Sequence, residues 1–70
     1  MQLVYEASDI LEAHIVAGML RSRHLEVYVD GHFLHGAIGE MAPLGLARVY
    51  VSEEDFALAW KLVEDYKKAE

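Results

Sequence analysis

The sequence predicts a single α+β domain over residues 1–70 in which strands and helices follow the order β-α-β-β-α. Three observations favour this class. Apolar residues make up 54% of the 70-residue chain, a fraction typical of a folded domain rather than of a disordered segment. The chain has no cysteine, so neither a disulfide nor a thiolate metal site supports its fold. Segments that alternate like strands are separated by segments whose apolar residues recur at helical spacing.

The first part of the chain predicts a strand, a helix and a second strand. Residues 2–6 are rich in residues that favour strands. A helix is expected over residues 9–23, with Ser8 or Asp9 as its N-cap. If Asp9 is the cap, Glu12 lies at the third helical position of a capping box. The residues at 25–30 alternate between apolar and polar and predict the second strand.

The second part of the chain predicts a long loop, a third strand and a second helix. Residues 31–45 contain four of the five glycines and the single proline, a composition typical of a loop. A strand is expected over residues 46–51, and a helix over residues 53–68. Ser52 and Asp55 have the spacing of a second capping box at the start of that helix.

This order favours a two-layer sandwich, because a crossover between parallel strands is right-handed and places its helix on one face of the sheet. We expect a ferredoxin-like βαββα unit: a three-stranded sheet with both helices on one face, lacking the last strand of that fold. A missing strand leaves an exposed sheet edge that must be blunted, covered or paired with another chain.

Alternation along the strands divides their side chains between two faces. The valines expected to face the helices are Val4, Val27, Val29, Val49 and Val51. The residues expected on the opposite face are Leu3, Tyr5, Glu26, Tyr28, Arg48 and Tyr50. Three tyrosines on an open face favour burial against another subunit or under the loop. With Arg48 as the only cation of this face, they do not favour stacking on nucleic acid.

The first helix is predicted to be apolar on two sides. Its small core-facing residues are Ala13, Val16, Ala17 and Leu20, and a roughly opposite face carries Leu11, Ile15, Gly18 and Met19. Either the longer side chains fold around the core, or this face meets another chain, and we favour the second interpretation. The second helix has one apolar stripe expected to pack on the sheet: Phe56, Ala59, Trp60, Leu62, Val63 and Tyr66.

The loop over residues 31–45 is the candidate site for a small ligand. Its candidate binding residues are Gly36, Gly39, Glu40 and His35. It is not a phosphate loop, because it leads into a strand and carries no Gly-Lys-Ser/Thr. We therefore favour a structural or interface loop over ligand binding, and ligand binding over catalysis. His32-x-x-His35 with Glu40 offers three zinc-type ligands, but this pattern is weak, and we expect no metal, no cofactor and no catalytic residue.

The charge and hydropathy exclude several classes of partner. A formal net charge of −6 is a poor match for nucleic acid or anionic lipid. No apolar run is long enough to span a membrane, and no basic segment follows Met1, which predicts a cytoplasmic protein.

Several short motifs together resemble one family of small bacterial proteins. They are Leu3-Val4-Tyr5, Glu12-Ala13, Val29-x-Gly31, Gly36-Ala37-Ile38-Gly39-Glu40, Pro43-Leu44-Gly45, Val49-x-Val51 and Ala59. The chain resembles the prokaryotic signal-transducing protein family, a domain family of unknown function. The resemblance implies a ferredoxin-like fold related to nitrogen-regulatory signal transducers, with no established activity or catalytic residues. Members often have a Gly-Ile step after the first helix, where this chain has His24-Leu25.

These observations favour a non-enzymatic module for regulation or protein interaction. We expect a homodimer, with a regulatory protein as a possible further partner. The expected interface residues are Leu11, Ile15, Met19, Tyr5, Tyr28 and Tyr50. The alternative is a small-ligand sensor that uses the glycine-rich loop.

Overall fold

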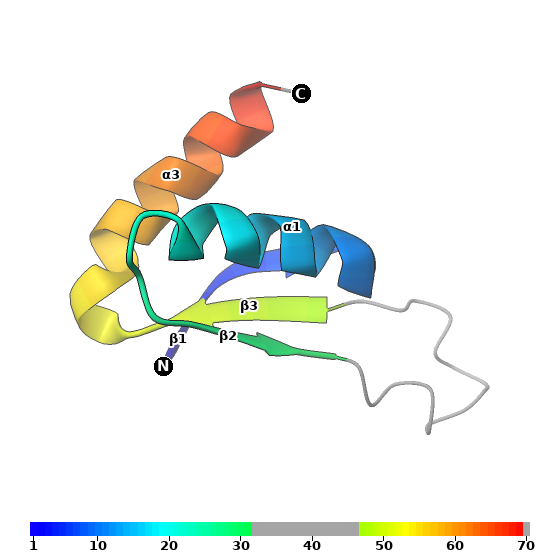
Figure 1. The fold of residues 1–70 in the computed structure, drawn as a ribbon, viewed down its shortest axis with the longest axis horizontal. Coiled ribbons are helices and arrows are strands. Elements are labelled where there is room, and N and C mark those ends of the chain that lie inside the picture. Colours follow the sequence, from blue (N-terminus) through cyan, green and yellow to red (C-terminus); the bar gives the residue numbers. More distant parts are fainter. Residues whose placement is uncertain (32–46, 70) are drawn as a thin grey trace.

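The computed structural model describes residues 1–31 and 47–69 of the chain. Its elements are β1 (Gln2–Ala7), α1 (Ile10–Arg21), β2 (Val27–Asp30), β3 (Ala47–Val51), the short 3-10 helix η2 (Glu53–Asp55) and α3 (Phe56–Lys68) (Figure 1). This order confirms the predicted β-α-β-β-α sequence of elements. Apart from Gly31, the loop expected over residues 31–45 lies outside the described residues.

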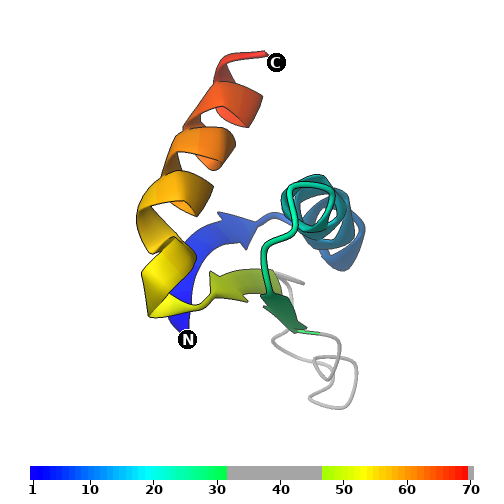
Figure 2. The same ribbon diagram turned by 60° about the vertical axis from the view of Figure 1, so that its left-hand side comes forward.

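The three strands form one sheet in the order β1-β3-β2, and each neighbouring pair is antiparallel. Both helices lie on the same face of this sheet (Figure 2). Helix α1 contacts all three strands, whereas α3 packs mainly on β1 and extends away from the sheet towards the C-terminus (Figure 1). The predicted α+β, ferredoxin-like βαββα arrangement is therefore confirmed, and β3 separates the two strands that α1 connects.

The core lies between the sheet and the two helices. Its largest fully buried side chains are Leu20, Val16, Val49, Val51 and Val63. They come from the helix-facing positions of β3 and from the inner faces of α1 and α3. This agrees with a repeat of two residues in a strand and of 3.6 residues in an α-helix. Each such side chain stabilises the fold by about 1.5–3 kcal/mol relative to an exposed position.

A β-bulge in β1 overturns one prediction about the faces of the sheet. Leu3 lies opposite Tyr50, but Tyr5 lies opposite Val49, so Val4 is an additional residue that the partner strand does not match. A bulge of this kind reverses the alternation that follows it. Tyr5 therefore lies on the helix-bearing side, packed against the core, and its prediction on the open face is wrong.

The start of α1 follows the prediction, and its end is earlier than predicted. The Asp9 side chain accepts a hydrogen bond from the backbone N–H of Glu12 at 2.8 Å, so Asp9, and not the alternative Ser8, is the N-cap. At the other end, His24 has a φ of 69°, in the left-handed region that favours glycine. The N–H of His24 donates to the carbonyl of Arg21, and that of Leu25 to the carbonyl of Leu20. These two bonds form a Schellman motif, which closes the helix before residue 23.

The start of α3 differs from the prediction. Among the described residues, the Ser52 side chain bonds to the carboxylate of Asp55 at 3.1 Å and caps no backbone N–H, so the second capping box is wrong. The first turn is the 3-10 helix η2. Trp60 was expected in the core, but 48% of its surface is exposed. It follows the buried residue Ala59 by one position, which is roughly 100° around the helix, and so lies at the flank of the apolar stripe.

Candidate functional site

The best-connected titratable group of the described residues is the carboxylate of Glu12. Its Oε1 accepts hydrogen bonds from the Ser8 backbone N–H at 2.9 Å and from the Ser8 hydroxyl at 3.0 Å. Its Oε2 accepts from the hydroxyls of Tyr5 at 2.8 Å and Tyr66 at 3.4 Å. The Ser8 backbone N–H, followed by the Tyr5 hydroxyl, lowers the pKa of Glu12 below its ordinary value of 4.5.

This arrangement is suited to holding elements of the fold together. A carboxylate held by four donors is a weak base, because protonating it would weaken the bonds it accepts. The Tyr5 and Tyr66 rings meet edge to face with their centroids 6.2 Å apart. Glu12 therefore joins β1, the start of α1 and the C-terminal part of α3.

The outward side of α1 carries an apolar ridge, which we define as Leu11, Ile15 and Gly18. Leu11 in the first turn of α1 is 67% exposed and Ile15 in its middle is 53% exposed, although both are large aliphatic residues. Gly18 is also exposed, and a Cβ atom placed there would meet no described atom within 4 Å. The ridge lies opposite the buried face of α1, so the described residues of this molecule leave it uncovered.

The side of the sheet away from the helices forms a second surface, which we call the open face. One row across it consists of Leu3, Tyr50 and Tyr28, which lie opposite one another on the three strands. The rings of Tyr28 and Tyr50 are tilted with centroids 6.1 Å apart. The adjacent row consists of Glu6, Arg48 and Asp30. In this row Arg48 pairs with Glu6 at 3.4 Å, and both side chains are about half exposed.

A shallow hollow borders the end of the sheet where β1 and β2 begin. It is lined by Met1, Glu26 and the four residues Ser52, Glu53, Glu54 and Asp55. The wall of this hollow is acidic. Within residues 1–31 and 47–69, no three histidine, cysteine, aspartate or glutamate side chains come together in a way that could hold a metal ion.

The predicted interface residues fall into three groups. Leu11, Ile15 and Tyr28 are exposed, and Tyr50 is partly buried on the open face. Met19 and Tyr5 are partly buried and pack against the core. Whether these residues contact another chain stays a prediction.

The predicted ligand residues Gly36, Gly39, Glu40 and His35 lie outside the described residues. The structure also adds two exposed apolar side chains that the sequence analysis had not assigned to a surface, Leu58 and Trp60. Their positions on opposite flanks of the α3 stripe are the signal that could have identified them. None of the described helices has the length and apolar character needed to cross a bilayer.

Comparison with known proteins identifies one family. A family model with the description "Putative prokaryotic signal transducing protein" matches residues 1–67, nearly the whole chain. No curated protein and no solved structure shows significant similarity to it.

Proposed function

Because the chain belongs to this signal-transducing family, we propose that it is a non-enzymatic interaction module whose first partner is a second copy of itself. Its family points to signal transduction, and the features described above support binding rather than catalysis. Glu12, its best-connected carboxylate, is held by structural hydrogen bonds. The apolar side chains that a partner would cover are already exposed on the outward side of α1.

The α1 ridge is the observation that carries this proposal. Leu11 and Ile15 expose most of their apolar surface to solvent, which is unfavourable unless another surface covers them. Gly18 adds a second argument. A glycine inside a helix costs about 1 kcal/mol relative to alanine. Nothing among the described atoms fills the space where a Cβ would lie, so packing within the molecule does not require glycine here.

The spacing of the ridge fits a second helix. Its residues lie four and then three positions apart, the spacing at which one helix presents a continuous seam to another. A glycine in such a seam lets the two backbones approach closely. The ridge is small beside the roughly 800 Å² that each partner contributes to a standard interface. We therefore expect reversible association that depends on protein concentration.

Sedimentation velocity over a range of protein concentrations tests this proposal. We expect Leu11→Glu and Ile15→Glu to shift the protein to the monomer, because each places a charge in the seam. Ala57→Glu is the matched control, since it adds the same charge at an exposed position of α3. Circular dichroism should show an unchanged fold in all three variants. A wild-type protein that remains monomeric at every concentration, or an equal effect of Ala57→Glu, would refute self-association through α1.

A further inference from the structure

We propose that the open face of the sheet binds an extended segment of a partner protein in which an arginine and an apolar residue lie two positions apart, so that both side chains face the sheet. This inference rests on the proposed function, because it assigns a chemical class to a regulatory partner of the same module. It concerns a different surface from the α1 ridge.

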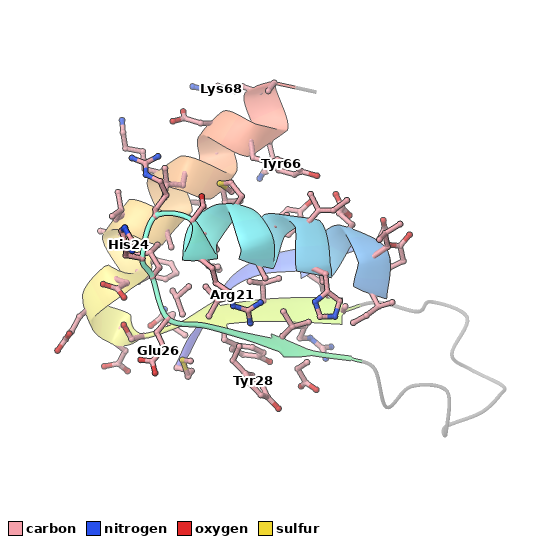
Figure 3. The ribbon with its side chains drawn as sticks, viewed as in Figure 1. Arg21, His24, Glu26, Tyr28, Tyr66 and Lys68 are labelled. Atoms are coloured by element: carbon pink, nitrogen blue, oxygen red, sulfur yellow. The ribbon has the colours of Figure 1, made fainter. Side chains whose placement is uncertain are left out.

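The first argument comes from side chains of the edge strand β2 and from Glu26, the residue that precedes this strand. Glu26, Tyr28 and Asp30 alternate along the chain and therefore share one face. The side chains of Glu26 and Tyr28 point away from α1, whereas Arg21 points from α1 towards β2 (Figure 3). Tyr28 is 53% exposed, so its ring is accessible between two carboxylates.

Such a pattern suits an arginine side chain. A guanidinium stacks on an aromatic ring and at the same time donates hydrogen bonds to a carboxylate beside it. Tyr28 provides the ring, and Glu26 and Asp30 provide an acceptor on each side of it. The rest of the row, Tyr50 and Leu3, offers apolar contact to the neighbouring side chains of the same segment.

The charge of this face favours a basic partner segment over a second copy of the chain. Its one cation, Arg48, is already paired with Glu6. Within the described part of the chain, no cationic side chain pairs with Glu26 or Asp30. A second copy, which carries the same face and a formal net charge of −6, would bring acid against acid. A basic segment is complementary to the face, and its apolar residues would cover the exposed Leu3 and Tyr28.

The edge position of β2 also suits an extended segment. Among the described strands, β2 pairs only with β3, so its other edge has no strand partner there. At this edge the guanidinium of Arg21 donates to the carbonyl of Val27 at 3.0 Å. That contact satisfies one edge acceptor and makes simple addition of a strand less favourable. We therefore assign the partner to the face of β2, where side chains carry the recognition.

The test uses the full chain and a synthetic peptide that repeats Arg-Ser-Leu-Ser, so that arginine and leucine share one side of the extended segment, with binding followed by calorimetry and by amide chemical shifts. We expect shifts at Tyr28, Tyr50 and Leu3, and binding that weakens as salt is added. A peptide with citrulline in place of arginine keeps the shape and loses the charge, and we expect it to bind at least tenfold more weakly.

Two protein variants locate the site. The double variant Glu26→Gln/Asp30→Asn should weaken peptide binding about fivefold to tenfold, since it removes both acceptors beside Tyr28. Tyr28→Ser should weaken it to a similar extent. Asp65→Asn is the control for general charge, because Asp65 is exposed on α3, away from the sheet.

Three results would overturn the inference. The first is that the wild-type protein does not bind the peptide, and the second is that the citrulline peptide binds as tightly as the arginine peptide. The third is that Asp65→Asn weakens peptide binding by at least half as much, in free energy, as the double variant does. The Ile15→Glu variant separates this inference from the proposed function. Its sedimentation tests self-association alone, and its peptide binding should match that of the wild type.

Discussion

Replacing Glu12 by glutamine removes the charge that joins β1, α1 and α3. Glutamine has one carbonyl oxygen, so it can accept the bonds of Ser8 or those of the two tyrosines, but not both sets. A hydrogen bond to a charged acceptor contributes about 1.5–3 kcal/mol, and a neutral one about 0.5–1.5 kcal/mol. Since Glu12 is partly exposed, we expect a total loss of about 1–2 kcal/mol.

The assay is urea unfolding followed by circular dichroism at several pH values. For a domain of this size, each kcal/mol corresponds to about 4–8 °C in melting temperature, so thermal unfolding gives an independent measurement. The contacts lower the pKa of Glu12 in the folded chain, so folding stabilises its charged form. That contribution is complete above the ordinary carboxyl pKa of 4.5 and is lost as the pH falls below it. The wild-type protein should therefore lose more stability on acidification than Glu12→Gln.

The contacts of the two tyrosines provide an internal check. The Tyr5 hydroxyl lies at 2.8 Å from Glu12 and that of Tyr66 at 3.4 Å, so Tyr5→Phe should cost more than Tyr66→Phe. Asp65→Asn, on the exposed side of α3, serves as the charge control and should change stability little. If Glu12→Gln is as stable as the wild type at neutral pH and its stability depends on pH in the same way, then the hydrogen bonds of Glu12 do not hold the two helices together.

Three further predictions concern helix geometry and the core. His24→Gly should raise the free energy of unfolding by about 1 kcal/mol, because glycine adopts the left-handed conformation of residue 24 without strain; a lower melting temperature would contradict this. Gly18→Ala should also stabilise the monomer by about 1 kcal/mol, yet it should weaken self-association in sedimentation, since its methyl group separates the paired helices. Leu20→Ala removes the largest fully buried side chain and should cost about 3 kcal/mol in urea unfolding, and a loss below 1 kcal/mol would contradict the described core.

Most of the fold could be predicted because its signals are local. Alternation in the strands and helical spacing of apolar residues identified the three strands and the two α-helices of the described residues, but not the 3-10 helix η2. The distance to Glu12 made Asp9 one of the two candidate N-caps. The bulge at Val4 could not be predicted, because an extra residue in β1 is defined only by its pairing with β3. The predicted end of α1 was wrong because His24 takes the left-handed conformation that ends the helix, and sequence rules assign this conformation to glycine.

The candidate surfaces were predicted less completely. The wheel of α1 placed Leu11 and Ile15 opposite the core, and the structure has both exposed. It also placed Met19 on that face, but this side chain lies at the flank and is flexible enough to reach the core. For Trp60 the error is the opposite one, because it was expected in the core but is exposed. Whether a flanking residue is covered depends on the tilt of α3 across the sheet, which is a tertiary property.

The two proposed surfaces are compatible because they lie on opposite sides of the sheet. Helix α1 lies on one side, whereas Tyr28 and Glu26 point to the other (Figure 3). A dimer formed through the α1 ridge would therefore leave the open face of each protomer accessible. Such a dimer would present two identical sites, and a partner carrying two basic segments would bind it more tightly than it binds either site alone. Weak self-association would then control the strength of partner binding, because a change in protein concentration would change the fraction of bivalent molecules. This link would give a small domain a physical means of transmitting a signal.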